Sequence, residues 1–419
     1  MGRSILMGLA DWLQYLESLP SGLTNKSLDN VKNVANKLNL LNFTGKIITV
    51  AGTNGKGSCV VFLESILLQA GLKVGAYISP HLLHYNERIR LNGKDVDTKI
   101  LCQAFATIKM ECTGVILSYF EFTTLTALFI FKKQKPDVLL LEAGLGGRFD
   151  AVNILESDIS IITTISLDHT QILGNTKEAI GYEKSGIMRS FKPVICGKNM
   201  PASITIAADN IQAKLYCLDR DFNYVEKNDC WNWQFITEVI KKLPLLRLPV
   251  NSAALALMTI KLLSEDFKIS NQAIITGLKN AFLPGRWQRL IFNGKEIIFD
   301  VAHNHESATM LALNLNRGES KGRILAVVGM SSDKDIVATL KPLIRTVDRW
   351  YLGAFNNIRA ASVTNLAQGL QEAGGTDFVL LPSITLSLQQ AIAECQEKDR
   401  IAVFGSFYTV AEGLKLITS

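Results

Sequence analysis

The sequence lacks the marks of membrane, secreted and zinc-binding proteins. No apolar run is long enough to span a bilayer, and no signal-like apolar segment builds up before Asp11. The 7 cysteines are scattered, odd in number and never in C-x-x-C spacing, which argues against a disulfide framework and against a zinc site. We therefore expect a cytoplasmic protein with reduced thiols and no membrane partner.

Basic runs, low-complexity tracts and short-period repeats are also missing. Without a run of Lys and Arg with interleaved aromatics, the net charge of +6 suits anionic small molecules better than a nucleic-acid groove, and no nucleic-acid partner is expected. A hydrophobic share of 48% with 20% charged residues is typical of a globular chain. A length of 419 residues exceeds what one core usually supports, so two domains are favoured.

Short apolar runs alternate with helix-like stretches along the chain. Four near-continuous runs are typical of parallel strands buried on both faces: residues 47–51, 74–79, 137–142 and 159–166. After an irregular stretch around residues 209–249, further strands are expected near residues 297–301, 324–329, 349–352, 378–381 and 401–405. We predict an α/β fold: a P-loop-type, mostly parallel sheet domain over residues 1–283, and a smaller Rossmann-like α/β domain over residues 284–419.

A glycine-rich stretch, ITVAGTNGKGS, lies between the first predicted strand and a helix-like segment. It misses the pattern G-x-x-x-x-G-K-[ST] twice, because Val50 stands where that pattern has glycine and Gly57 where it has a hydroxyl. Free N–H groups, the positive end of the following helix and Lys56 can still bind phosphate oxygens. We interpret the stretch as a variant phosphate-binding loop; an ordinary glycine turn is the alternative.

Three polar residues follow other predicted strands at the same edge of the sheet: Ser79, Glu142 and His169. Ligands of parallel sheets gather beyond the carboxyl ends of the strands, so these side chains form a candidate cation site. Mg²⁺ bound to a nucleotide takes few protein ligands, although histidine is an uncommon one. Each residue also has a structural alternative: Ser79 can begin a turn, Glu142 can cap a strand, and His169 can donate to the backbone.

Further candidates lie outside the loop. Lys184, in YEKSGI, is on a short helical stretch, with a solvated surface lysine as the alternative. Arg286 follows the predicted domain junction and suits bidentate contact with phosphate or carboxylate. Asp300 can hydrogen-bond a ribose or hold that arginine, and a structural salt bridge is the alternative for both. His303 follows the same strand and is, with Lys56 and Lys184, a candidate catalytic residue.

Nine ordered motifs resemble those of the folylpolyglutamate synthase and dihydrofolate synthase family, within the muramyl-peptide-ligase-like amide ligases. They are TVAGTNGKGS, YISPHLLHYNERI, SYFEFTTLTAL, LLLEAGLGGRFDAVN, SLDHTQILGNT, YEKSGI, LPGRWQ, FDVAHN and VFGSFYTVA. The resemblance covers nearly the whole chain and is strongest to the bacterial bifunctional members. It implies ligation of L-glutamate to dihydropteroate or folates with ATP and Mg²⁺, through an acyl phosphate, by a monomer.

The resemblance also implies roles for individual residues. The nucleotide contacts would be Thr53, Asn54, Gly55, Lys56, Gly57, Ser58, Asn251, Arg286 and Asp300. The pterin-substrate contacts would be Ser118, Tyr119, Phe120, Glu121, Phe149, Asp150 and Ala151. Ser79, Glu142 and His169 would hold Mg²⁺, and Lys184 would carry a carbamate.

Three departures from the family pattern concern substrate recognition. Asn25-Lys26-Ser27 replaces a D-L-G-like turn of the pterin pocket, His305 replaces a proline, and Tyr408 replaces a histidine. Two other functions stay open at this point. One is a related Mg-ATP amide ligase acting on a muramyl-type or other acid, and the other is a catalytically inactive nucleotide-binding regulator.

Overall fold

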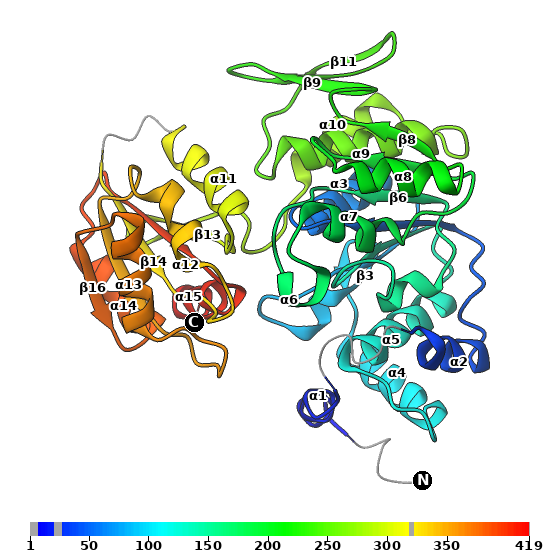
Figure 1. The fold of residues 1–419 in the computed structure, drawn as a ribbon, viewed down its shortest axis with the longest axis horizontal. Helices are drawn as coiled ribbons and strands as arrows, with labels where there is room; N and C mark the ends of the chain where they lie inside the picture. Colours follow the sequence, from blue (N-terminus) through cyan, green and yellow to red (C-terminus); the bar gives the residue numbers. More distant parts are fainter. Residues whose placement is uncertain (1–6, 21–26, 318–321, 419) are drawn as a thin grey trace. The chain divides into compact units, whose positions relative to one another are not determined.

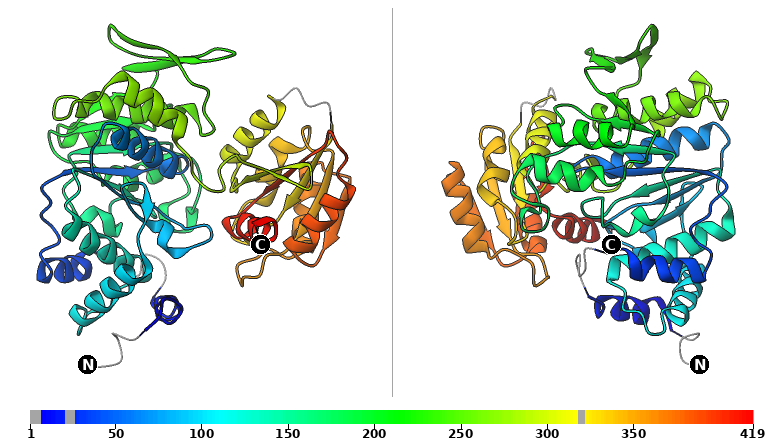
Figure 2. Two further views of the ribbon diagram at one scale, coloured as in Figure 1. Left: turned by 180° about the vertical axis from the view of Figure 1, so that it is seen from behind. Right: turned by 45° about the vertical axis from the view of Figure 1, so that its right-hand side comes forward.

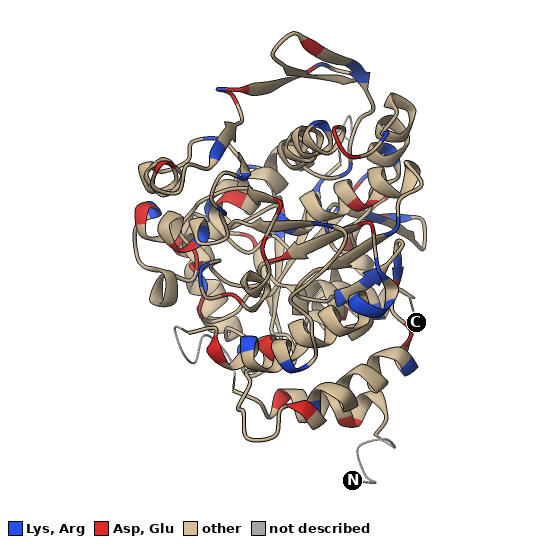
Figure 3. Cartoon of the chain, turned by 90° about the vertical axis from the view of Figure 1, so that its right-hand side faces the viewer, with Lys and Arg blue, Asp and Glu red and all other residues tan. Residues whose placement is uncertain are grey.

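The computed structural model describes residues 7–20, 27–317 and 322–418, and the chain forms two compact units, Met1–Phe282 and Leu283–Ser419 (Figure 1). Within the described ranges, no helix has the length and apolar character needed to span a bilayer. Acidic and basic residues are interspersed along the elements of the chain (Figure 3). The positions of Asn25 and Lys26, part of the first departure, lie outside the described residues.

The first unit is built on an eight-stranded sheet in the order β4-β3-β2-β5-β1-β6-β7-β8. Its strands are β1 (Lys46–Ala51), β2 (Val74–Tyr77), β3 (Ile89–Leu91), β4 (Lys94–Asp95), β5 (Val138–Glu142), β6 (Ile159–Ile162), β7 (Pro193–Cys196) and β8 (Lys214–Cys217). The pairs from β2 to β8 are parallel, whereas β3 and β4 add an antiparallel edge. The carboxyl ends of β1, β2, β5 and β6 therefore lie at one edge of the sheet.

Helices cover both faces of this sheet (Figure 1). The described helices of this unit are α1 (Leu9–Glu17), α2 (Asp29–Lys37), α3 (Lys56–Gln69), α4 (Thr98–Glu111), α5 (Tyr119–Gln134), α6 (Thr170–Leu173), α7 (Lys177–Ser185), α8 (Ala202–Asn210), α9 (Val250–Leu263) and α10 (Asn271–Asn280), with 3₁₀ turns η1 (Tyr85–Arg88) and η2 (Ala151–Ile154). Residues of α4, α5, α7 and α8 share one apolar core with Ile47, Ala51, Leu139 and Leu141. On the other face α3 packs against α9 and α10, and Gly277 permits this approach because a Cβ there would lie 2.5 Å from Ile66 Cα.

A separate three-stranded antiparallel sheet lies between β8 and α9. It comprises β9 (Phe222–Glu226), β10 (Trp231–Phe235) and β11 (Glu238–Leu243), and it contacts α9 (Figure 2). The sequence pattern predicts an irregular stretch here, which is wrong. Trp231 and Trp233 are buried and alternate with polar Asn232 and Gln234, which is the period of a half-buried strand.

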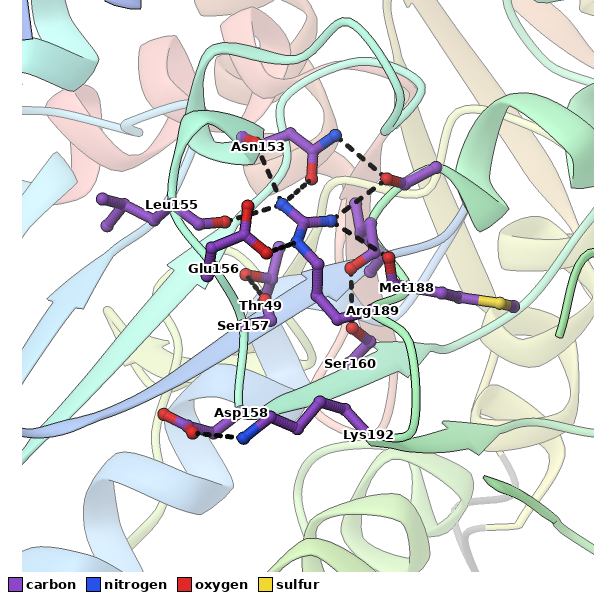
Figure 4. Close-up of polar contacts among 12 residues, drawn as sticks. Thr49, Asn153, Leu155, Glu156, Ser157, Asp158, Ser160, Met188, Arg189 and Lys192 are labelled. Carbon is purple, nitrogen blue, oxygen red and sulfur yellow. Dashed lines mark hydrogen bonds and ion pairs between the residues drawn. The ribbon is translucent and has the colours of Figure 1, made fainter. Parts of the chain in front are cut away.

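Arg189 ties the loop after α7 to the loop after η2 (Figure 4). Its guanidinium pairs with Glu156 at 2.6 Å and donates to the Leu155 carbonyl at 2.7 Å and to the Asn153 side chain at 3.0 Å. A guanidinium has five donors in a fixed plane, so one residue can satisfy several loop acceptors. This network fixes the chain directly after the helix that carries Lys184.

The second unit has a six-stranded sheet in the order β12-β13-β17-β14-β15-β16, parallel except for the β12–β13 hairpin. Its strands are β12 (Gln288–Phe292), β13 (Lys295–Asp300), β14 (Ile324–Val328), β15 (Arg349–Gly353), β16 (Phe378–Leu381) and β17 (Arg400–Phe404). Its helices are α11 (His305–Asn316), α12 (Ile336–Leu340), α13 (Val363–Ala373), α14 (Ile384–Glu394) and α15 (Phe407–Thr418), with the 3₁₀ turn η3 (Lys341–Leu343). The predicted α/β class with mostly parallel sheets is confirmed.

Candidate active site

The glycine loop joins β1 to α3 in a conformation that other residues would not adopt. Gly52 has φ 151° and Gly55 has φ 81°. A Cβ on Gly52 would lie 1.9 Å from Thr163 Oγ1, and one on Gly55 would lie 2.9 Å from Ser252 Oγ. The first amides of α3 have no acceptor within their own helix, so the loop presents N–H donors at the positive end of a helix.

The loop is anchored to the segment that follows β6. The Thr53 amide donates to the Thr164 carbonyl at 2.8 Å, and Thr53 Oγ1 accepts from the Ser166 amide at 3.1 Å. Thr163 Oγ1 donates to the Asn54 carbonyl at 2.6 Å. The hydroxyl of Thr53 is therefore used to hold the loop in place.

Two lysines meet at the Gly52 carbonyl. Lys56 Nζ donates to it at 3.1 Å and Lys184 Nζ at 2.9 Å, and Lys56 Nζ lies 4.0 Å from Glu142 Oε1. Lys184 is only 4% exposed, so the surface-lysine alternative is wrong. Burial, together with the nearby charge of Lys56, lowers the pKa of Lys184 to about 7.

Glu142 and Ser79 lie together at the ends of β5 and β2. Glu142 is 4% exposed, and its Oε2 accepts from the Ser79 amide at 3.1 Å. A buried carboxylate suits a hard cation such as Mg²⁺. His169 directly precedes α6, in the left-handed region with φ 50°, and its side chain is exposed.

Among the described residues, no three His, Cys, Asp or Glu side chains gather as a metal site. The candidate set of Ser79, Glu142 and His169 contains only two residues of these types. A cation bound here would complete its coordination with phosphate and water oxygens, as Mg²⁺ on a nucleotide does.

Helix α7 carries Lys184 and begins at a side-chain cap. Thr176 Oγ1 accepts from the Ala179 amide at 3.1 Å, so the first turn of the helix is capped by a side chain.

Three polar residues of the predicted pterin pocket cap helices in the structure. Ser118 Oγ accepts from the Glu121 amide at 3.3 Å, and a Glu121 carboxylate oxygen accepts from the Ser118 amide at 2.7 Å. Asp150 accepts from the Leu145 amide at 2.9 Å and the Val152 amide at 3.1 Å, and burial raises its pKa to about 6.

The apolar members of that set lie around the same helix starts. Phe120 lies against Gly144, where an added Cβ would come within 2.7 Å of the Phe120 ring. The ring centres of Phe120 and Tyr77 are 5.8 Å apart. Tyr119 and Phe149 are half-buried, and Ala151 is buried at the start of η2.

Arg88 was not among the candidates from the sequence. Its guanidinium is 7% exposed, donates to His81 Nδ1 at 2.8 Å and lies over the rings of Tyr85 and Tyr119 at 5.4 and 5.5 Å. Within the described part of the chain no carboxylate pairs with it. Burial lowers the pKa of His81 to about 3, helped by the Arg88 charge, so His81 accepts this bond as a neutral imidazole. The motif YISPHLLHYNERI contains all of these residues except Tyr119 and was the available signal.

In the second unit, Asp300 organises the end of β13. It accepts from the Trp287 amide at 2.9 Å and from the Ala302 amide at 2.9 Å. Burial raises its pKa, and the neighbouring positive charge of Arg286 opposes that shift. The Arg286 guanidinium lies 5.5 Å from the Phe407 ring centre.

His303 and the two departures of this unit have defined contacts. His303 Nδ1 lies 2.8 Å from the Val301 carbonyl, which favours the tautomer with a proton on Nδ1. His305 Nδ1 lies 3.0 Å from the Ala338 carbonyl. Tyr408 stacks on Phe355 with ring centres 5.0 Å apart.

Comparison with known proteins assigns this architecture to a class. Residues 285–407 match the Mur ligase, glutamate ligase domain family. The matched residues lie within the second unit, which is therefore the glutamate ligase domain of a Mur-type ligase.

Individual relatives then define the family. The chain is 40% identical to a dihydrofolate synthase/folylpolyglutamate synthase of Escherichia coli, over 98% of this chain and 95% of that protein. It is 37% identical to the protein of that name from Haemophilus influenzae, over 96% of each. The chain belongs to the dihydrofolate synthase/folylpolyglutamate synthase family, which confirms the family and enzyme class predicted from the sequence.

Solved structures agree with this assignment. The structure of E. coli FolC in complex with DHPP and ADP has a TM-score of 0.93 at 39% identity, covering 99% of this chain and 98% of that chain. The Yersinia pestis bifunctional folylpolyglutamate synthase/dihydrofolate synthase complexed with AMPPNP and Mn ion has a TM-score of 0.94 at 41% identity, with 100% of both chains covered.

Proposed function

We propose that this protein ligates L-glutamate to dihydropteroate, giving dihydrofolate, and to folates. The observation that supports the proposal most strongly is the meeting of Lys56 and Lys184 at the Gly52 carbonyl, beside the buried Glu142. Family membership supports the ligase chemistry, and the named complexes of relatives with ADP or AMPPNP support a nucleotide with a divalent cation.

The proposed reaction has two steps. A carboxylate oxygen of the acid substrate attacks the γ-phosphorus of ATP, an O–P bond forms and ADP leaves. The amine of glutamate then attacks the carbonyl carbon, an amide forms, and phosphate and a proton leave. A carboxylate alone would have to expel oxide, so phosphorylation supplies the leaving group.

The glycine loop would hold the phosphates. We assign this role to residues 53–58, whose helix-start amides and Lys56 place positive charge where the transferred phosphoryl group becomes more negative. Asn251, Arg286 and Asp300 are also assigned to nucleotide binding. These assignments divide the chain at residue 283 into an ATPase domain and a glutamate-ligase domain.

Ser79, Glu142 and His169 would hold Mg²⁺. When bound, the ion neutralises charge on the phosphate oxygens. Glu142 supplies the anionic oxygen and is kept in place by the Ser79 amide.

Lys184 is proposed to carry a carbamate. Its pKa near 7 leaves a share of the buried amine neutral and nucleophilic at physiological pH. The amine nitrogen attacks the carbon of CO2, an N–C bond forms and a proton is released. The product replaces a second cation beside Lys56 with an anion. A carbamate resonance after addition of ¹³C-bicarbonate, missing in Lys184→Met, would support this step, and its absence from the wild type would reject it.

The acid and amine substrates are assigned to separate groups of residues. Ser118, Tyr119, Phe120, Glu121, Phe149, Asp150 and Ala151 would form the pterin pocket, where capped helix starts fix the backbone. His303, whose Nδ1 lies 2.8 Å from the Val301 carbonyl, is assigned to accept a proton of the glutamate amine. We further propose a monomeric, cytoplasmic enzyme. Light scattering that gives a multiple of 46.2 kDa, or recovery in a membrane fraction, would contradict this.

One assay tests the function. Dihydropteroate and tetrahydrofolate are offered separately with Mg-ATP and glutamate, and ADP release is followed. We expect release that depends on both the acid and glutamate, and a fall of at least about 100-fold for Lys56→Ala. Turnover that is equal in this variant, or that responds only to a muramyl-type acid, would contradict the proposal.

A further inference from the structure

The start of α9 lies beside the glycine loop. Ser252 Oγ donates to the Gly55 carbonyl at 3.3 Å. Glycine permits this approach, because a Cβ on residue 55 would lie 2.9 Å from Ser252 Oγ. Asn251 directly precedes Ser252 in the first turn of α9, where no side chain caps the helix. The loop contact of Ser252 therefore holds Asn251 next to the proposed phosphate site.

The side chain of Asn251 is oriented from another element. The hydroxyl of Tyr224, on β9 of the three-stranded sheet, donates to Asn251 Oδ1. An asparagine amide has one acceptor oxygen and two N–H donors, and a half-turn about its last torsion exchanges them. With Oδ1 paired to the hydroxyl, the amide offers N–H donors to any further partner.

Tyr224 is itself held on both sides. Its ring meets that of Trp231 edge to face at 6.2 Å, and the Lys198 ammonium lies 4.7 Å from its centre. Lys198 is fixed by an ion pair with Asp219 at 3.0 Å. Burial raises the pKa of Tyr224, so its hydroxyl keeps the proton that it donates. The hydroxyl therefore has a set position and a set polarity.

We propose that Tyr224 is a positioning residue for the nucleotide: its hydroxyl fixes the Asn251 amide so that N–H donors face an acceptor atom of ATP. The inference depends on the proposed assignment of Asn251 to the nucleotide and extends it. It gives the three-stranded sheet, which contributes no other residue to the proposed site, a role in nucleotide binding.

Tyr224→Phe tests this with minimal disturbance, because the ring and its contacts with Trp231 and Lys198 remain. We expect the KM for ATP and the Kd for ADP to rise about two- to tenfold, the worth of one hydrogen bond. The kcat and the KM for glutamate should stay within about twofold. The matched control is Tyr216→Phe on β8, the strand that precedes β9 in the chain. The Tyr216 ring lies 5.9 Å from that of Phe235, and loss of its hydroxyl should leave all four constants unchanged.

A double-mutant cycle separates positioning from a structural role. If Tyr224 acts through Asn251, then Tyr224→Phe has no further effect on ADP affinity once Asn251→Ala is present. Full additivity, or an ADP Kd that Tyr224→Phe leaves unchanged, would overturn the inference. ADP binding is measured by calorimetry and does not require turnover. A wild type that binds ADP but ligates nothing would therefore refute the proposed function, while the binding data would still test the positioning role of Tyr224.

Discussion

At the scale of single residues, Lys56 and Lys184 differ because of their surroundings. Both donate to the Gly52 carbonyl, but only Lys56 has the Glu142 carboxylate within 4.0 Å. Lys184 is buried with no carboxylate in ion-pair contact among the described residues, so its charged form is disfavoured and its pKa falls to about 7. This difference pairs Lys56 with a carboxylate and leaves Lys184 as the candidate for chemistry at its amine.

Lys184 should therefore make stability depend on pH. Its pKa is about 7 in the folded chain against an ordinary value of 10.5, so below pH 7 both states are protonated and the cost of burying the charge is fully present. Between the two values the unfolded chain binds more protons, and wild-type stability rises with pH by up to about 1.4 kcal/mol per unit. In CO2-free buffer, chemical denaturation of wild type and Lys184→Met should show this slope in the wild type alone.

The exposed Lys99 provides the control for this measurement. Lys99→Met should keep the wild-type slope between pH 7 and 9. If Lys184→Met also kept the wild-type slope of stability against pH, the account would be contradicted. That result would mean that Lys184 is not buried in its charged form at low pH.

At the scale of elements, the turn between β1 and α3 depends on one glycine. Gly52→Ala would force a left-handed alanine and press its Cβ to 1.9 Å from Thr163 Oγ1, the atom that anchors the Asn54 carbonyl. We expect a loss of about 1–3 kcal/mol in stability and weaker ADP binding by calorimetry. Gly71→Ala is the control, because Gly71 has φ 81° and no atom within 4 Å of the added Cβ. Equal losses of ADP affinity in the two variants would show that the Thr163 contact is unimportant.

The sequence predicted the elements that bury both faces of a sheet. Strands β1, β5, β14 and β17 appear as continuous apolar runs because helices cover both their sides. The short antiparallel edge of β3 and β4 gives no such signal, since it has few residues and is partly exposed. The predicted strand over residues 159–166 was too long, because after Ile162 the chain leaves the sheet to anchor the glycine loop.

Site residues followed a similar rule. Those next to glycine motifs or strand ends, such as Lys56 and Glu142, could be named from local pattern alone. Tyr224 could not, because its contact with Asn251 joins a strand of irregular sequence pattern to a helix 27 positions away. Arg88 has a local motif but no carboxylate partner that the sequence would suggest.

At the scale of the whole molecule, the proposed chemistry is divided between two units. The first unit contains the phosphate loop, Glu142 and Lys184, and the second contains Arg286 and His303. In each unit, polar candidate residues follow the carboxyl ends of parallel strands. The central claim concerns the first unit, where Glu142 and Lys56 would share one magnesium-bound nucleotide.

Mn²⁺ binding in the presence of ADP, followed by the electron paramagnetic resonance signal of the free ion, tests that claim most directly. We predict that the wild type binds one Mn²⁺ per chain only when ADP is present. Glu142→Gln keeps the acceptor for the Ser79 amide but removes the charge, and it should weaken Mn²⁺ binding by at least about tenfold. Mn²⁺ binding that is independent of ADP and equal in wild type and Glu142→Gln would contradict the account.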